Sequence, residues 1–390
     1  MRPCDRRRAF TLIELLIVIV IIGVLSALLL PAITGAIRTT KNAAVAAEIN
    51  ILATKLAAFR VKYGDYPPSR IILSEDGAFN TADTTMVPNA NGNDITYGAL
   101  ASRTVYYMRK FWPGLPVSTT STPLFDGAGT WYDFNGNGVF DRPATPGRGV
   151  ILDGTEALCF WLGGIPLNTG TTGDPQVSLS GFARQPFAYP GLSGVKPHPF
   201  RNNLNNGNAA YSEDRTPVYH EFAVQRLADA DGDGFLEFLD SLGTSKPLVY
   251  FKAEGGSGYD PNDANLPEPD TTGAIAAVTR KFTVGFPTVT AGGWGGRIVI
   301  SPGPNPYTTN AANTAITTSW HRPTSYQIIS SGADGLYGPG GRYVPAGSAV
   351  TVILPLEPQT AGVNNLNTTD ADVRSVEKDN IANFTSGTLD

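Results

Sequence analysis

Cysteine, histidine and charged residues are all scarce in this 390-residue chain, which has 2 Cys, 3 His and 16% charged residues. His198, His220 and His321 share no spacing typical of a catalytic or metal-binding motif. The chain also lacks G-x-S-x-G, H-E-x-x-H, paired C-x-x-C and phosphate-binding glycine motifs. These absences exclude the commonest hydrolase, metalloprotease and nucleotide-binding signatures, although a pair of catalytic carboxylates leaves no such signature. We therefore predict that the protein is not an enzyme.

The two cysteines lie far apart, Cys4 near the N-terminus and Cys159 inside the apolar run 157–161. If the first nine residues are removed, Cys159 is left alone and no intrachain disulfide can form. Its apolar neighbours indicate a small buried side chain rather than a reactive thiol.

Acidic residues outnumber basic ones, and the formal net charge is −5. Residues 1–9 hold four arginines and one aspartate, a net of +3, so the charge without them is −8. A surface of this sign repels nucleic acid and attracts cations. We therefore expect no nucleic-acid partner.

A long apolar run from Phe10 to Ile37 contains one ionisable residue, Glu14. As a helix this run would span roughly 42 Å at about 1.5 Å per residue, which is enough to cross a bilayer. The arginines that precede it favour a cytoplasmic N-terminus, with the rest of the chain outside. A cleaved secretory signal would have a shorter apolar core followed by a small-residue cleavage site. An ordinary single-pass anchor gives no reason for Glu14, because a carboxylate in lipid costs a few kcal/mol.

The sequence around this run resembles the processing signal of type IV pilins and type II secretion pseudopilins. The matching residues are Arg6-Arg7-Arg8-Ala9 followed by Phe10-Thr11-Leu12-Ile13-Glu14-Leu15-Leu16. The resemblance implies that prepilin peptidase cuts between Ala9 and Phe10 and methylates the new N-terminus. It further implies that Phe10 and Glu14 take part in assembly, and that Pro31 kinks the helix. The chain departs from the family at Ala9, where glycine is usual.

The helix should continue past the membrane to Tyr63, because apolar residues recur at steps of three and four: Val45, Ile49, Leu52, Leu56, Phe59 and Tyr63. Gly64 and the pair Pro67-Pro68 then end it. We expect a leader over 1–9, a membrane or filament-core helix over 10–37, an amphipathic helix over 38–64, and one globular head over 65–390.

The head contains most of the 43 glycines and 30 prolines, which favours short strands and loops over a helical bundle. The predicted fold class is therefore α+β, with the long helix packed against an antiparallel sheet. Strand-like runs occur at 104–107, 248–252, 297–300, 326–330 and 349–354. The polar segment 357–376 has no such run.

One acidic stretch has the spacing of a calcium-binding loop, with Gly at the sixth position. Its candidate ligands are Asp229, Asp231, Asp233, the Phe235 carbonyl, Glu237 and Asp240. An ordinary acidic turn is the alternative, since Asp and Gly also dominate turns.

Two weaker metal candidates exist. A second loop begins in the same way with Asp133, Asn135, Asn137 and Asp141, but its twelfth position is Ala144. Segments 331–335 and 379–384 resemble the C-terminal calcium loops of major secretion pseudopilins, which implies roles for Asp334 and Asp379. About 40 inserted residues separate these two segments.

Taken together, these features predict a structural subunit of a type II secretion-like pseudopilus. The resemblance implies these partners: further copies and related pilin-like subunits, prepilin peptidase, an inner-membrane assembly platform with its ATPase, and membrane lipid before assembly. It implies storage in the bacterial inner membrane and then a periplasmic or surface filament. A surface pilin with a ligand-binding head and a membrane-anchored enzyme are the alternatives.

The mature protein is expected to begin at Phe10, because the processing motif surrounds the Ala9–Phe10 bond. Mass spectrometry of the assembled protein should show loss of residues 1–9 and addition of one methyl group. An intact Met1 leader in assembled material would contradict the prediction.

Overall fold

The computed structural model describes about three fifths of the chain. The described residues are 12–87, 95–127, 131–168, 177–184, 199–200, 214–229, 232–254, 258–260, 263–264, 289–290, 293–294, 306–309, 319–333, 335, 337, 341–343, 379–385 and 388–389. Ala9, Phe10, Asp231 and Asp334 lie outside them, as do the predicted strands 297–300 and 349–354 and the segment 357–376.

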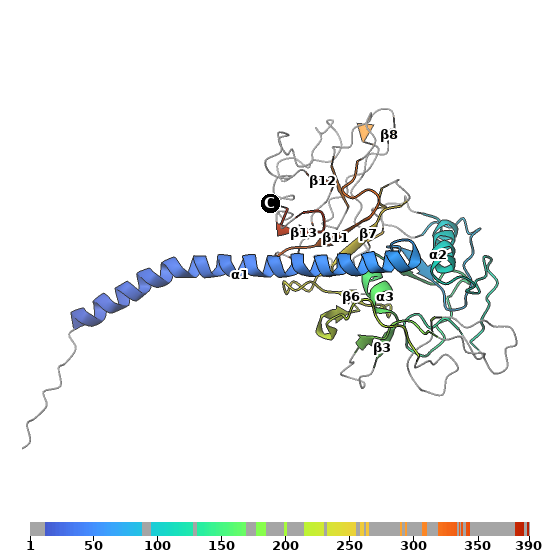
Figure 1. The fold of residues 1–390 in the computed structure, drawn as a ribbon, viewed down its shortest axis with the longest axis horizontal. Helices are drawn as coiled ribbons and strands as arrows, with labels where there is room; N and C mark the ends of the chain where they lie inside the picture. The colour runs from blue at the N-terminus through green and yellow to red at the C-terminus, as the bar shows by residue number, and fades with distance from the viewer. Residues whose placement is uncertain are drawn as a thin grey trace, which may run out of the picture.

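The N-terminal helix α1 (Leu12–Tyr63) is 52 residues long and extends far beyond the head (Figure 1). It ends where Gly64 takes a φ of +78°, which a residue with a side chain rarely adopts, and where the Gly64 N–H donates to the Arg60 carbonyl at 2.8 Å. Pro31 lies inside α1, and the Thr34 hydroxyl donates to its carbonyl at 2.9 Å. The predicted continuous helix is confirmed.

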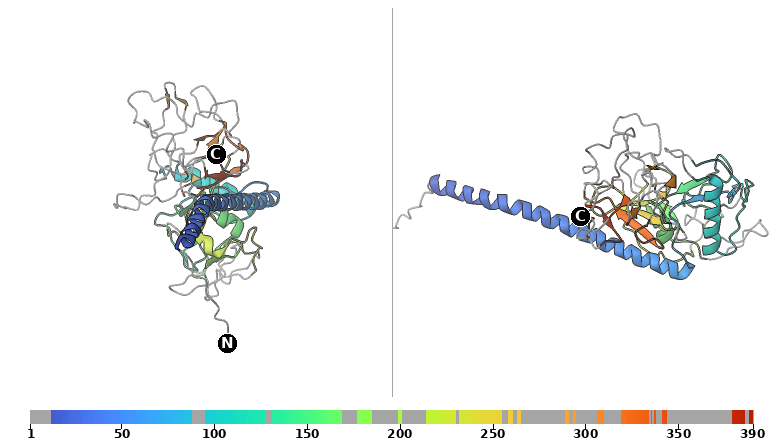
Figure 2. Two further views of the ribbon diagram at one scale, coloured as in Figure 1. Left: turned by 90° about the vertical axis from the view of Figure 1, so that its left-hand side faces the viewer. Right: turned by 90° about the horizontal axis from the view of Figure 1, so that it is seen from above.

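The two halves of α1 have opposite environments. Every described residue from Leu12 to Lys41 is exposed, whereas Val45, Ile49, Leu52, Leu56 and Phe59 are buried. These five lie on one face, as predicted from their spacing, and Tyr63 is half-buried at its end. Figure 2 shows the head along the C-terminal half of the helix only.

A three-stranded antiparallel sheet lies against α1 in the order β13-β11-β7. Its strands are β7 (Val249–Lys252), β11 (Tyr326–Ser330) and β13 (Ile381–Ala382). Strand β13 pairs with β11 through Ile381 and Ser330, so a segment near the C-terminus forms one edge of the sheet. The predictions for 248–252 and 326–330 are confirmed, and so is the α+β class.

The other described strands are short and form two-stranded pairs. They are β1 (Ile71–Leu73) with β2 (Val150–Leu152), β3 (Pro166–Asn168) with β4 (Val177–Leu179), β5 (Leu227–Ala228) with β6 (Glu237–Phe238), β8 (Val289–Thr290) with β9 (Gly293–Trp294), and β10 (Tyr307–Thr308) with β12 (Gly341–Arg342). All of these pairs are antiparallel except β10–β12, which is parallel. A short 3₁₀ helix, η1 (Val224–Arg226), precedes β5.

The strand predicted at 104–107 is wrong, because these residues lie in helix α2 (Tyr97–Phe111). The Thr96 hydroxyl caps this helix by accepting from the Ala99 N–H at 3.1 Å. Its buried residues recur at helical spacing, and the Thr104 hydroxyl donates to the Leu100 carbonyl at 3.0 Å. Packing of that face overrides the strand preference of the local run of Thr, Val and Tyr.

Aromatic rings fill the core between α1, α2 and α3 (Ala157–Gly163). Trp161 is fully buried, and its ring stacks on Trp112 and meets Phe59 and Phe111 edge-on. Its indole N–H donates to the Pro68 carbonyl at 3.1 Å. The helix, the head and the chain that joins them therefore share one core.

Packing of α1 on the head predicts a sharp difference between neighbouring positions. Leu52→Ala should lower the free energy of unfolding by about 2–5 kcal/mol, because Leu52 is 0% exposed. The control Ile51→Ala, at a residue 49% exposed, should change it by about 0.5 kcal/mol or less. Urea unfolding of the full chain in detergent, followed by tryptophan fluorescence, measures both. Equal losses would contradict this packing.

Candidate functional site: the exposed helix and the acidic loops

The exposed half of α1 carries an unusually large apolar surface. Leu12 is 80% exposed, Leu28 is 70% exposed, and every large apolar side chain from Leu12 to Ile37 is exposed. The helix is long and apolar enough to cross a membrane. Such a surface must be covered by lipid or by other apolar helices, because leaving it in water is costly.

Glu14 lies in the first turn of α1, within this apolar surface. A negative charge there interacts favourably with the free N–H groups at a helix N-terminus. It is the one acidic residue among the described residues of the exposed half, since Glu48 is the next along α1. The position therefore combines apolar surroundings with a single carboxylate, as the sequence predicts.

The junction between the exposed half and the head is an ion pair that sequence reasoning missed. Arg38 in α1 lies 3.2 Å from the Asp379 carboxylate, which also accepts the Ala333 N–H at 2.9 Å. Segments 331–333 and 379–384 are therefore adjacent, despite the long insertion between them. These two contacts of Asp379 join the segment just before β13 (Ile381–Ala382) to α1.

In the described part of the loop 229–240, Gly232 and Gly234 take positive φ. The Asp229 carboxylate accepts the N–H groups of Gly232 and Gly234 at 2.8 and 3.2 Å. Asp240 points elsewhere: its oxygens accept from the Leu242 N–H and the Ser330 hydroxyl, each at 3.0 Å. The two ends of the predicted ligand set thus have separate partners, and Glu237 is buried in β6.

Among the residues that the structure describes, no three Asp, Glu, His or Cys side chains gather closely enough to hold a metal ion. Asp231, the central candidate ligand, lies outside that set. The Asp229 and Asp240 carboxylates accept from backbone amides and hydroxyls, which are neutral donors that a cation can replace.

The weaker loop has a partner that the sequence did not indicate. Asn135 and Asn137 donate to one Asp141 oxygen at 2.8 and 2.7 Å, and the buried Asp133 accepts the Gly138 N–H at 3.0 Å. Glu75, far earlier in the chain, accepts the Asp141 N–H at 2.7 Å. The twelfth position of this loop is Ala144, which has no carboxylate. The fold instead brings the Glu75 carboxylate to the loop.

Burial, together with the nearby negative charges of Asp133 and Asp141, raises the pKa of Glu75 to about 9. The proton is then held tightly because the charged form is poorly solvated and is repelled by its neighbours. A divalent cation at this place would favour the charged form instead. No motif spacing links Glu75 to the loop, so only the folded chain shows the association.

A bidentate ion pair connects the first acidic loop to the long helix. Arg226, just before β5, donates to the two Glu48 oxygens at 2.6 and 2.7 Å. Its guanidinium also lies 4.2 Å from the centre of the Phe238 ring in β6. The β5–β6 hairpin is thereby fixed at a defined height along α1.

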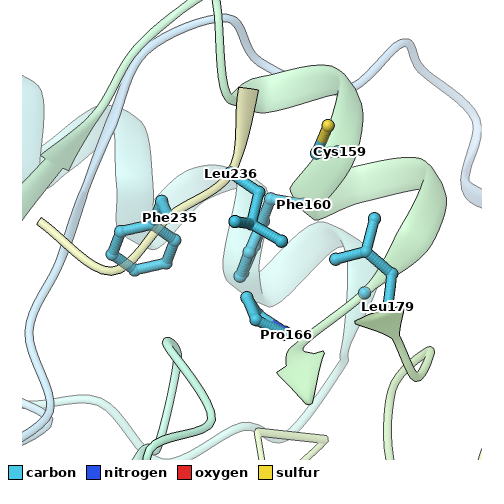
Figure 3. A pocket seen from close by; sticks show the side chains of 7 residues that line it. Cys159, Phe160, Pro166, Leu179, Phe235 and Leu236 are labelled. Carbon is cyan, nitrogen blue, oxygen red and sulfur yellow. The ribbon is translucent and has the colours of Figure 1, made fainter. Parts of the chain in front are cut away.

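A small hollow near α3 offers no chemistry of its own (Figure 3). Its lining is apolar apart from Cys159, and includes Phe160, Leu179 and Leu236. Cys159 is buried, as predicted, and burial raises the pKa of its thiol. The hollow therefore has neither a thiolate nor a set of polar groups to position a substrate.

Comparison with known proteins finds a match for the N-terminal segment. Residues 4–30 match the family described as the prokaryotic N-terminal methylation motif. No curated protein and no solved structure matches the chain. The match covers the predicted cleavage bond between Ala9 and Phe10, Glu14 and most of the exposed apolar helix. The chain thus carries the signal of a type IV pilin-like precursor, which is processed by prepilin peptidase.

Proposed function

We propose that the protein is a structural subunit of a type II secretion-like pseudopilus, polymerised through its N-terminal helix. The observation that carries this proposal is the exposed apolar half of α1, which no described part of the head covers. Such a helix needs an apolar environment at every stage. Membrane lipid supplies it before assembly, and a bundle of identical helices supplies it in the filament. The methylation motif at the same residues supports the proposal.

In this proposal the precursor is stored in the bacterial inner membrane, with residues 1–9 in the cytoplasm and the head outside. Prepilin peptidase removes the leader and methylates Phe10. The assembly platform and its ATPase then add the subunit to a periplasmic or surface filament, beside further copies and related subunits. The role is structural rather than enzymatic.

A surface type IV pilin is the second candidate, favoured by the size of the head and its two acidic loops. A head of this size offers room for a bound ligand. Neighbouring genes separate the two candidates: a secretin with an assembly ATPase indicates secretion, whereas a retraction ATPase indicates a surface pilus.

Glu14 should be required for assembly. Cleavage creates an amino group on Phe10, and Glu14 of one subunit can pair with Phe10 of the next within the apolar core. Glu14→Ala should be inserted and processed normally yet fail to enter filaments. Glu14→Asp, one methylene shorter, should assemble poorly.

The readout is the amount of filament sheared from cells, with mass spectrometry to confirm processing. Ser26→Ala, at another polar residue of the same exposed run, serves as the control and should assemble normally. Wild-type filament yield from Glu14→Ala would refute the pairing mechanism.

We also propose that calcium binds the loop 229–240, through Asp229, Asp231, Asp233, the Phe235 carbonyl, Glu237 and Asp240. The oxygen spacing supports this proposal, and so do Gly232 and Gly234, whose positive φ lets the loop turn tightly. Binding would require Asp240 to exchange its hydroxyl partners for the ion. The loop 133–141, with Glu75 beside it, is a second place for the same cation.

Calcium should therefore stabilise the head. A ligand at one hundred times its Kd that binds only the folded state adds about 2.7 kcal/mol. The full chain in detergent should melt at a higher temperature with calcium than with chelator, and Asp229→Asn should reduce the difference. Magnesium, which demands a smaller octahedral site, serves as the control. An unchanged melting temperature with calcium would show that the loop is an ordinary turn.

A further inference from the structure

The carboxylate of Asp240, which lies two residues after β6, is bonded to the end of β11. One of its oxygens accepts from the Ser330 hydroxyl at 3.0 Å. The other accepts from the Leu242 N–H at 3.0 Å and the Thr244 hydroxyl at 3.2 Å. The Ser330 oxygen also accepts the Gly332 N–H at 3.3 Å, and both Asp240 and Ser330 are buried. Asp240 therefore fixes the start of the turn that follows β11.

That turn lies directly against the segment before β13. Gly332 has a φ of +69°, and a β-carbon there would lie 2.5 Å from an Asp379 carboxylate oxygen. The next N–H, that of Ala333, donates to Asp379 at 2.9 Å, and Asp379 lies 3.2 Å from the Arg38 guanidinium of α1. A path of hydrogen bonds and close packing thus runs from Asp240 to α1.

Two ion pairs hold α1 to described parts of the head, and they differ in strength. Arg226 donates to both Glu48 oxygens, and the two side chains are 20% and 17% exposed. Arg38 contacts one Asp379 oxygen, and the Arg38 side chain is 60% exposed. Bidentate, partly buried pairs are stronger than exposed pairs with a single contact. Glu48 is therefore a firm point of attachment, whereas Arg38 is a releasable one.

The releasable contact lies where α1 leaves the head. Figure 1 shows β13 at the end of the head from which the exposed half emerges. Arg38 follows the exposed apolar run directly, and Val45 is the first buried residue of α1. Arg38 lies ten residues before Glu48, which is about 15 Å along a helix. Two attachments this far apart fix the direction of the exposed half, whereas one attachment leaves it free to swing.

We infer that Asp240 is a positioning residue for α1. Through the turn 330–333 it holds Asp379 against Arg38, and it thereby keeps the exposed half of α1 in one direction relative to the head. Loss of the Ser330 contact frees the turn, and an exposed ion pair contributes too little to hold the turn in place by itself. The importance of this direction for filament packing rests on the proposed function, whereas the coupling between Asp240 and Arg38 does not.

Arg38→Ala in the full chain tests the coupling from its far end. Amide hydrogen exchange in residues 240–244, measured by mass spectrometry in detergent, should become at least about twofold faster, because coupling between two sites is reciprocal. Chelator is present throughout, since calcium in the loop 229–240 would compete for Asp240. Arg38→Lys, which keeps the positive charge, should retain most of the wild-type protection. Unchanged exchange at 240–244 in Arg38→Ala would overturn the inference.

Arg60→Ala is the matched control for that variant, because Arg60 is also an exposed arginine of α1 but lies near the other end of the head. It should leave exchange at 240–244 at the wild-type rate. The same acceleration in Arg60→Ala as in Arg38→Ala would show that any loss of charge on α1 loosens the head, and it would count against a specific path.

Two hydroxyl deletions, one at each oxygen of the Asp240 carboxylate, test the path itself. Ser330→Ala interrupts the path and should accelerate exchange in residues 379–385 at least about twofold. Thr244→Ala removes a partner of the other oxygen and should leave this exchange unchanged. Equal acceleration by the two variants would mean that Asp240 acts only through general stability, and the inference would then be wrong.

A double variant separates the path from local damage around Ser330. Once Ser330→Ala has interrupted the path, adding Arg38→Ala should have no further effect on exchange at 240–244. Independent effects of the two changes would contradict the inference. Melting of each variant confirms that the head remains folded, and Arg38→Ala keeps the test decisive if Ser330→Ala does not fold. None of these measurements requires filaments, so the filament yield of Glu14→Ala judges the proposed function separately.

Discussion

The constraint on which the structure depends is that α1 is apolar along a length that the head covers only in part. The C-terminal half places Val45, Leu52 and Phe59 in the core, where they exclude water. The N-terminal half exposes its apolar side chains on all sides. Burial of apolar surface is the dominant favourable contribution to folding and association, so one half of this helix folds the head and the other requires lipid or neighbouring helices. One continuous helix therefore links folding of the head to the proposed assembly.

The head is held to that helix by segments that are distant in sequence. Trp161 of α3 and Phe111 of α2 pack around Phe59 of α1, while the edge strand β13 comes from near the C-terminus. Two ion pairs, Arg38–Asp379 and Arg226–Glu48, attach further head segments at two heights. A rigid attachment of this kind fixes the head surfaces relative to the helix axis. Regular packing of many copies requires that fixed relation.

The described carboxylates of the acidic loops accept hydrogen bonds from neutral donors of the chain. Asp229 accepts two backbone N–H groups, Asp240 accepts hydroxyl and amide donors, and Glu75 retains its proton through burial beside Asp133 and Asp141. Each solution lowers the cost of grouped negative charge. Each also uses neutral partners, so a cation that entered would exchange them without breaking an existing charge pair. The loops are thus compatible with both a plain turn and a cation site.

The sequence by itself determined the features that depend on local order along the chain. The apolar run, the single carboxylate at Glu14, the processing motif and the helix face from Val45 to Phe59 all follow from spacing along one helix. The strands 248–252 and 326–330 were equally readable, because apolar and β-branched residues are concentrated in them. Tertiary structure decided the rest: residues 104–107 became helical because α2 buries one face, and Glu75 reached the loop 133–141 only through folding. The pairing of Arg38 with Asp379 is also tertiary, since contacts between residues hundreds of positions apart leave no periodic trace in a single sequence.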